Sequence, residues 1–233
     1  MKLNCKLPKM KIIKNREDAI LALVQNKDVL HVGCVDSGLM DVKIKTNKLL
    51  HKKIASKAKL LYGIDVDKDG IDKMIQMGFN NLFLCELENC NINRKFDIII
   101  LGEVIEHIDN CGSALKSLRK FANNNTKIVF TTPNAYYYLF WISYLFKIES
   151  IHPDHNYLFS FISLKQLIEK FGYSVDEYYI IWEKIDFTKN DDNRLTKIFK
   201  KSIALIINIP YLFKYLIPQF GKGIFLISKF KYN

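Results

Sequence analysis

Residues 29–132 contain five short apolar runs, namely VLHVG (29–33), KLLYGID (59–65), NLFLCE (81–86), FDIIILG (96–102) and KIVFTT (127–132). Helix-like segments separate them, around residues 48–57, 68–77 and 113–121. Strands that are apolar throughout and alternate with helices are typical of a parallel sheet that is covered on both faces. The pattern therefore predicts an α/β fold with a doubly wound sheet.

The remaining third of the chain continues the pattern more loosely. An aromatic run, AYYYLFWISYLF (135–146), is followed by the polar loop HPDHN (152–156) and by a helix, SLKQLIEKFG (163–172), for which Gly172 is the expected C-terminal stop. A strand is predicted over YSVDEYYIIW (173–182), a helical segment over Arg194 to Leu216, and a last strand over GIFLISKF (223–230). The tail is thus expected to add two strands to the sheet, with helical insertions at its ligand-binding edge.

Composition restricts the class of protein. Hydrophobic residues make up 49% of the 233 residues, which excludes a disordered chain. Five cysteines without a CxxC pair predict neither a disulfide framework nor a zinc-thiolate site, and they favour a reducing compartment. The first residues lack the apolar core of an export signal, and no apolar run reaches the ~20 residues of a membrane span. We expect a cytoplasmic protein.

The formal net charge is +11, from 35 Lys and Arg against 24 Asp and Glu. Such a charge is compatible with an RNA, phosphosugar or anionic-lipid partner, and equally with a lysine-rich solvated surface. The charge by itself therefore does not select a partner.

Candidate ligand-binding residues stand at the ends of the first three predicted strands. Gly33 and Gly38 frame the first turn, Asp65 ends the second strand, and Glu86 follows the third. A glycine allows a ligand close to the backbone, and an acid after the second strand is placed to accept hydrogen bonds from ribose hydroxyls. Asp67 is the alternative acid, although it is equally suited to capping a helix. The spacing predicts a nucleoside cofactor at the carboxyl ends of the strands.

The series VLHVGC, LLYGIDVD, FLCELEN, FDIIILGEVIEHI and IVFTTPN resembles the motifs of class I S-adenosylmethionine-dependent methyltransferases, in particular the small-molecule and glycan-modifying branch. The resemblance implies a Rossmann-like, seven-stranded sheet with an antiparallel last strand. It also implies cofactor contacts: Gly33, Cys34 and Val35 at the methionine part, Asp65 with the adjacent Val66 at the ribose, Glu86 and Leu87 at the adenine, and Gly102 at the sulfonium.

The resemblance divides a single domain, residues 1–233, into four parts. They are an N-terminal extension (1–27), a cofactor-binding core (28–132), an acceptor-site insertion (133–172) and C-terminal strands with a basic, apolar helical segment (173–233). Two residues depart from the family pattern: His31 stands where most members have an acid, and Val35 where most have glycine. Both changes predict weaker cofactor binding. They indicate either a tolerated variant or a non-catalytic binding partner.

The turn Glu103-Val-Ile-Glu106-His107 holds side chains that we expect to take part in the reaction. In a helical turn the i,i+3 spacing places both carboxylates on one face, beside an imidazole. Glu103, Glu106, His107 and the later His155 form a candidate site for Mg²⁺ or Mn²⁺. The set resembles the metal site of methyltransferases that modify the terminal ribose of small RNAs. The competing interpretation is a helix start, with the carboxylates at the positive end of its dipole and His107 packed against the sheet.

An oxygen acceptor is favoured because a sugar hydroxyl must lose a proton, and this chain offers bases. His155 is the first candidate base, followed by His107 and Glu106. The expected function is O-methylation of a sugar or glycan precursor, a step in glycan biosynthesis, with or without a divalent metal. RNA 3′-terminal ribose is the alternative acceptor, but the residues after His155 lack the acidic-Trp element of those enzymes. Nucleic acid is thus the less favoured partner, and the oligomeric state stays open.

Two apolar segments have more than one interpretation. The aromatic run after Asn134 is expected to form a core helix, or else to stack on an acceptor or lie in a membrane interface. The segment from Arg194 to Lys214 mixes lysine with large apolar residues. Packing against the domain is the expectation for it, with pocket closure, dimerisation or contact with an anionic membrane as alternatives.

Overall fold

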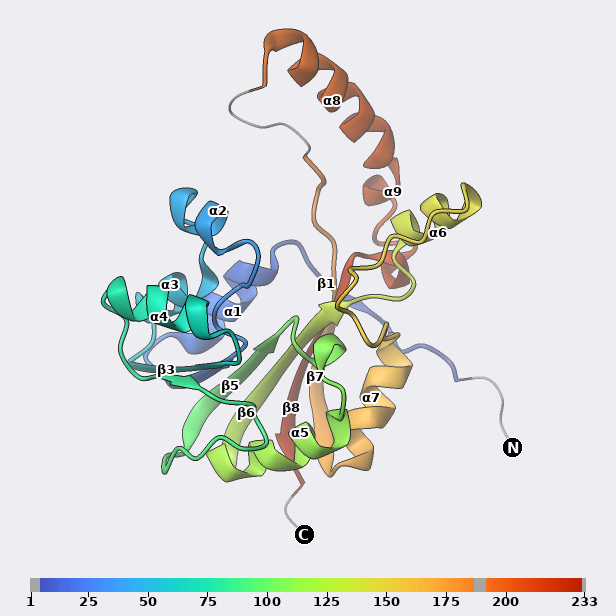
Figure 1. Cartoon of the computed structure of the whole chain (residues 1–233). Helices are drawn as coiled ribbons and strands as arrows, with labels where there is room; N and C mark the ends of the chain where they lie inside the picture. The colour runs from blue at the N-terminus through green and yellow to red at the C-terminus, as the bar shows by residue number, and fades with distance from the viewer. Residues whose placement is uncertain (1–4, 187–191, 232–233) are drawn as a thin grey trace.

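A computed structural model describes residues 5–186 and 192–231, and these form one mixed sheet of eight strands (Figure 1). The strand order is β1-β7-β8-β6-β5-β2-β3-β4. The strands are β1 (Lys11–Ile13), β2 (Asp28–Val32), β3 (Leu60–Asp65), β4 (Leu82–Leu84), β5 (Phe96–Gly102), β6 (Ala122–Pro133), β7 (Tyr173–Ile181) and β8 (Gly223–Phe230). The α/β prediction is confirmed, and all seven predicted strands are present. The predicted ends of the domain, residues 1 and 233, lie outside the described residues.

One strand was not foreseen. Lys11–Ile13, assigned to the N-terminal extension, pairs in parallel with β7 and adds an edge strand to the seven that the resemblance implies. Ile12 and Ile13 lie opposite Ile180 and Ile181 in this pairing. The addition follows from β-branched side chains that continue the apolar surface of the sheet. The last strand, β8, runs antiparallel to both β6 and β7, as expected.

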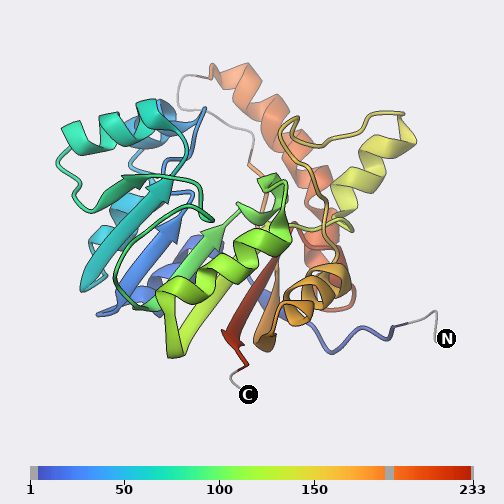
Figure 2. The same ribbon diagram turned by 60° about the horizontal axis from the view of Figure 1, so that its bottom comes forward.

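Helices cover both faces of the sheet (Figures 1 and 2). One face packs on α5 (Cys111–Ser117) and α7 (Phe161–Lys170), and the other on α1 (Arg16–Val24) and α3 (Leu50–Ala55). Along β5, alternate residues enter the two cores, Ile99 and Leu101 on one side and Ile98 and Ile100 on the other. Because both faces are buried, the strand reads as an unbroken apolar run.

The centre of the sheet positions the candidate site. β2 pairs with β3 on one side and with β5 on the other, so the strand order reverses at β2. Ligands of open α/β sheets bind at such a reversal, outside the carboxyl ends of the strands. The helix α4 (Lys68–Gln76) follows β3 at this edge, and α2 (Met40–Lys45) follows the turn after β2.

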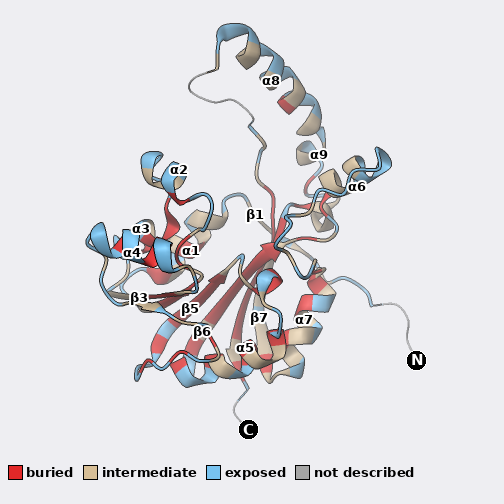
Figure 3. Cartoon of the chain, in the orientation of Figure 1, coloured by how far each residue is buried: buried red, intermediate tan, exposed pale blue. Residues whose placement is uncertain are grey.

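The two apolar insertions contradict the expectation of packed helices. No residue of α6 (Tyr138–Leu145) is buried, and Ala204 is the one buried residue of α8 (Arg194–Ile207). Figure 3 shows α8 projecting beyond the domain with mainly exposed and half-buried residues. Apolar composition indicates that a segment will be covered, but it does not say by what. Among the described residues, no helix combines the length and the hydropathy required to cross a bilayer.

His31, the departure from the family acid, lies in the core on the α3 face of the sheet. Its Nδ1 is 3.2 Å from Nδ1 of His51 on α3, and both side chains are almost fully buried. Burial lowers the pKa of each imidazole to about 3. Both rings are therefore neutral, and one donates a hydrogen bond to the other.

This pair predicts loss of stability in mild acid. Below pH 6.5 the unfolded chain protonates both histidines while the folded chain cannot, so the free energy of unfolding falls as the pH falls. Between pH 7 and pH 5 we expect the pair to account for a loss of about 2 kcal/mol or more. Urea denaturation at both pH values measures it.

The control is the double variant His31→Leu/His51→Leu, which removes both titrating groups and retains the other acid-sensitive residues. Its stability should fall less between pH 7 and pH 5 than that of the natural chain. Equal losses in the two proteins would contradict a buried, neutral pair.

Candidate functional site

A cavity of about 470 Å³ opens at the carboxyl ends of β2, β3 and β4 and against the turn after β5. Five of the eight residues predicted to contact a cofactor line it: Gly33, Asp65, Val66, Glu86 and Leu87. The side chains of Asp65 and Glu86 come from neighbouring strands, as the spacing required. We call this space the acidic cavity.

The charge of the acidic cavity is opposite to that of the chain. Among the described residues, four carboxylates line it, from Asp65, Glu86, Glu88 and Asp109, and no lysine or arginine does. A cavity with this lining favours a ligand that carries positive charge, because the local field of fixed carboxylates is negative. The formal net charge of +11 therefore says nothing about the ligand that binds here.

Gly33 makes the floor of the acidic cavity. Its φ is +68°, in the left-handed region, and a Cβ there would lie 2.4 Å from Cγ2 of Val104 in the turn after β5. Both the conformation and the contact exclude a side chain. The loops after β2 and β5 can approach this closely only because position 33 is glycine.

The structure distinguishes the two candidate acids after β3. Asp65 accepts hydrogen bonds from the backbone N–H groups of Val35 (2.9 Å) and Asp67 (3.0 Å), which hold its carboxylate at the cavity. Asp67 instead caps α4, where its side chain accepts from the N–H of Gly70. That hydrogen bond is the main reason that the pKa of Asp67 is lowered. Asp65 is thus the acid of the two that lines the cavity, and its contact with a ribose stays a prediction.

The turn after β4 carries the next contacts. Glu86 is exposed at the cavity, and its Oε2 accepts from Nδ2 of Asn89 at 2.8 Å. The cysteine count predicted no disulfide framework, but the structure differs here, because Cys85 and Cys90 form a disulfide. The turn brings their Cα atoms to 5.4 Å, a separation that a disulfide can bridge. Count and spacing alone did not reveal this proximity.

Cys34, Val35 and Gly102 do not line the acidic cavity. The Cys34 and Val35 side chains are fully buried in a small core between α2 and α4. A Cβ at Gly70 of α4 would lie only 2.0 Å from Cγ1 of Val35. The valine that replaces the family glycine is therefore accommodated by Gly70, and neither it nor His31 narrows the cavity. Neither departure blocks a ligand sterically, and weaker cofactor binding through loss of the family acid at position 31 stays a prediction.

A histidine cluster stands at the rim of the acidic cavity. His107 lines the cavity, and its ring centroid is 4.6 Å from that of His155. One possible ligand atom from each of Glu106, His107 and His155 lies within 4.8 Å of the others. Three of the four predicted metal ligands are therefore together. Burial lowers the pKa of His155, so its ring is neutral near pH 7.

Glu106 is the buried member of the cluster. Its exposed fraction is 0%, and neither carboxylate oxygen has a hydrogen-bond partner among the described residues. Burial raises the pKa of Glu106 to about 8, and the nearby Glu103 carboxylate adds to this rise. A buried carboxyl group without a partner is costly, and it is satisfied either by a proton or by a cation.

The loop that carries His155 is held against the 103–107 turn by Asn156. The Asn156 backbone N–H donates to the Glu106 carbonyl at 2.8 Å, and its side chain donates to the His107 carbonyl at 2.9 Å and to Asp109 at 2.7 Å. Nδ1 of His107 is 3.0 Å from the Asp154 carbonyl oxygen. These contacts explain why two histidines 48 positions apart meet. Sequence reasoning missed Asn156, although its place next to His155 was a usable signal.

The prediction for Glu103 was wrong. Its φ is +59°, so the chain does not form a helical turn there, and the i,i+3 spacing does not align it with Glu106. The helix-start interpretation fails too, because 105–107 is a short 3-10 turn, α5 begins only at Cys111, and His107 is exposed.

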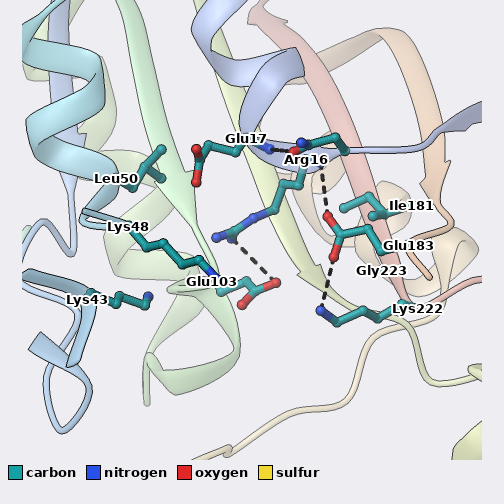
Figure 4. A pocket seen from close by; sticks show the side chains of 11 residues that line it. Arg16, Glu17, Lys43, Lys48, Leu50, Glu103, Ile181, Glu183, Lys222 and Gly223 are labelled. Carbon is teal, nitrogen blue, oxygen red and sulfur yellow. Dashed lines mark hydrogen bonds and ion pairs between the residues drawn. The ribbon is translucent and has the colours of Figure 1, made fainter. Parts of the chain in front are cut away.

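Glu103 instead faces a second cavity, of about 340 Å³. There its carboxylate lies 3.4 Å from Arg16, which also donates to the Thr131 hydroxyl at 3.2 Å. Figure 4 shows the Arg16 side chain directed at Glu103, with Glu183 and Lys222 paired beside them. Arg16, at the start of α1, was not among the predicted site residues.

Comparison with known proteins supports the resemblance to methyltransferases that the sequence motifs indicated. Residues 11–178 match the family model described as a methyltransferase domain. No curated protein matches the chain.

Solved structures share the fold. A SAM-dependent methyltransferase from Archaeoglobus fulgidus is 15% identical, with a TM-score of 0.53, 92% of this chain covered and 94% of that chain. The N-methyltransferase NodS from Bradyrhizobium japonicum, with bound S-adenosyl-L-homocysteine, is 11% identical, with a TM-score of 0.55 and coverage of 93% and 86%. Magnesium protoporphyrin IX methyltransferase from Synechocystis, also with bound SAH, is 13% identical, with a TM-score of 0.54 and coverage of 92% and 82%.

The contact between Gly33 and Val104 yields a prediction. Gly33→Ala should lower the free energy of unfolding by about 3 kcal/mol, because it adds left-handed strain to overpacking. Gly38 is the matched control: its φ is +75°, but a Cβ there meets nothing within 4 Å. Gly38→Ala should cost only the strain, about 1 kcal/mol. Urea denaturation of both variants tests this, and equal losses would show that the two loops do not need the close approach.

Proposed function

Since this chain belongs to the methyltransferase domain family, we propose that it transfers the methyl group of S-adenosylmethionine to a hydroxyl oxygen of a sugar or glycan precursor. The observation that carries the proposal is the acidic cavity with the histidine pair at its rim. The bound cofactor would supply a methyl group that its sulfonium charge has already activated. The residues of this chain must therefore bind, align and deprotonate.

The acidic cavity suits this cofactor by shape and by charge. S-Adenosylmethionine carries a sulfonium and an ammonium group against one carboxylate, so four lining carboxylates without lysine or arginine favour it. A nicotinamide dinucleotide carries an anionic diphosphate and would be disfavoured by the same lining. In this proposal Asp65 accepts from the ribose hydroxyls, Glu86 accepts from the adenine amino group, and Gly33 allows the methionine part close to the backbone; all three residues line the cavity.

The histidine pair is suited to an oxygen acceptor. Methyl transfer from a sulfonium needs alignment, whereas a sugar hydroxyl also needs to lose its proton. His155 is half-buried and neutral, beside the cavity-lining His107, so it can accept that proton as the new oxygen–carbon bond forms and can later release it to water.

The same side chains support a second form of the proposal. Glu106, His107 and His155 offer one oxygen and two nitrogens, a set that suits Mn²⁺ or Zn²⁺ and, with added water ligands, Mg²⁺. A cation would satisfy the buried Glu106 carboxylate and would lower the pKa of a hydroxyl bound to it. This form favours a vicinal diol as acceptor, and the 3′-terminal ribose of RNA is the alternative substrate that it supports.

Cofactor binding is tested at Asp65. Asp65→Asn removes the charge and one acceptor, and it should weaken binding of S-adenosylhomocysteine by about tenfold or more. Asp72→Asn, at an exposed position of α4, is the control and should leave the affinity unchanged. Titration calorimetry measures both. Equal affinities for the two variants would contradict the placement of the ribose.

Two variants in the loop between α6 and α7 test the proposed catalytic base. His155→Ala should lower kcat for methyl transfer to a nucleotide sugar by about 10²- to 10⁴-fold without changing cofactor affinity. His152→Ala, in the same loop but exposed, should stay within about threefold of the natural enzyme. Formation of S-adenosylhomocysteine reports the rate. Equal rates in the two variants would contradict His155 as the base.

A chelator and a second acceptor distinguish the two forms of the proposal. The base-only form expects activity that chelator leaves unchanged. Loss of activity with chelator, its return with Mn²⁺, and preference for a short RNA over nucleotide sugars would select the metal-assisted ribose enzyme instead. A chain that binds cofactor but methylates neither acceptor class would contradict the proposed substrate and leave the family assignment intact.

A further inference from the structure

Large apolar side chains cover two projecting parts of the chain, α6 and the segment from α8 through α9 (Ile209–Leu212) to Leu216. Leu145, Leu195 and Leu216 are 81%, 78% and 77% exposed. We call the exposed apolar residues of these two segments the apolar platform; they are Trp141, Ile142, Tyr144, Leu145, Phe146, Leu195, Ile198, Phe199, Leu205, Ile206, Ile209, Leu212, Phe213, Tyr215 and Leu216. Fifteen exposed large apolar side chains on two neighbouring segments go beyond singly scattered surface residues, and they indicate an interaction site.

The pattern along α8 is that of an interfacial helix. Leu195, Ile198, Phe199, Leu205 and Ile206 recur at helical spacing and are all exposed, so they form one apolar stripe that faces away from the domain. The exposed Arg194 and Lys201 flank this stripe on one side, at the positions that basic residues take on helices lying in a membrane surface.

The two segments of the platform are connected. The Tyr138 hydroxyl of α6 donates to the carbonyl oxygen of Ile207 at the end of α8, at 3.0 Å. The Tyr138 ring stacks on Trp182, which also contacts the Tyr211 ring of α9. Figures 1 and 2 both show α6, α8 and α9 at the same end of the molecule. The platform is therefore carried by two insertions that meet at their bases.

The platform lies at the same edge of the sheet as the candidate site. α6 follows the carboxyl end of β6, and α8 follows that of β7, a strand parallel to β6 because both run antiparallel to β8. The loop with His152 and His155 also begins just after α6. A partner bound to the platform would thus lie at the edge of the sheet that also holds the acidic cavity.

The charge of the residues around the apolar platform indicates which partner it binds. Residues 194–222 include six lysines and arginines and no aspartate or glutamate. Lys200 pairs with Asp192, and Lys214 packs on the Tyr211 ring, whereas Lys147, Arg194 and Lys201 are exposed. Two copies of so basic a surface would repel one another, but an anionic lipid surface attracts it. A bilayer also takes up leucine, phenylalanine and tryptophan at its interface without demanding a matching shape.

We propose that the apolar platform docks this protein on an anionic lipid bilayer, with the α8 stripe and the tip of α6 at the boundary between headgroups and acyl chains. The full-length chain is sedimented with phosphatidylcholine vesicles and with vesicles of phosphatidylcholine and phosphatidylglycerol. It should bind the second kind more tightly, and added salt should weaken this binding.

Variants distinguish vesicle binding through the apolar platform from vesicle binding through exposed apolar side chains in general. Leu195→Gln/Leu205→Gln should weaken partition onto anionic vesicles by about tenfold or more. Val42→Gln/Ile75→Gln, at exposed helical positions away from the platform, should leave it unchanged. Lys201→Glu should weaken binding to anionic vesicles and leave any binding to neutral ones unaltered. Circular dichroism verifies that each variant is folded.

Several outcomes would overturn the proposal. One is a natural chain that binds neither kind of vesicle. Another is equal partition of the two double variants. A third is a dimer, seen by analytical ultracentrifugation without lipid, that Leu195→Gln/Leu205→Gln converts to a monomer, because the platform would then join two copies of the chain. None of these measurements requires methyl transfer, so they are independent of the proposed activity.

Discussion

The close approach of the loops after β2 and β5 is the constraint on which the site depends. Gly33 has no side chain to keep Val104 away, and β2 and β5 are neighbours at the point where the strand order reverses. Two consecutive residues after β5 then face different spaces, with Glu103 toward Arg16 and Val104 toward the acidic cavity. The positive φ of Glu103 produces this division and also sets the direction in which the chain reaches Glu106 and His107. Strained backbone at such a position is typical of functional sites.

The chain separates its charges by location. The acidic cavity carries four carboxylates although the whole chain has a formal net charge of +11, and residues 194–222 hold six basic residues and no acidic one. In our proposals, this separation lets one domain hold a cationic cofactor in its cavity while its surface attracts an anionic bilayer. In the proposed orientation, the basic and apolar insertions approach the bilayer and the carboxyl edge of the sheet lies next to it. In these proposals the basic surface serves docking, and the local carboxylates serve cofactor binding.

Much of the fold and part of the site were predictable from the sequence. The apolar strands were found because a sheet buried on both faces leaves a direct mark, and Asp65 and Glu86 followed from their places after β3 and β4. Three of the misses share a physical cause, since each depends on a contact between residues at least 20 positions apart in the chain or on one backbone angle. To predict where Val35 lies, one must know that Gly70 makes room for it. The position of His31 depends in the same way on its contact with His51, and that of Glu103 on the sign of its φ. The exposure of α6 and α8 was missed because amphipathic spacing does not reveal which surface will cover a helix.

A crystal structure of the full chain with S-adenosylhomocysteine is the most direct test of the proposed cofactor site. We expect ligand density in the acidic cavity, with the ribose at Asp65, the adenine at Glu86 and Leu87, the amino-acid end over Gly33, and the sulfur on the side of His107 and His155. Density in the Arg16–Glu103 cavity instead, or none at saturating ligand, would contradict it.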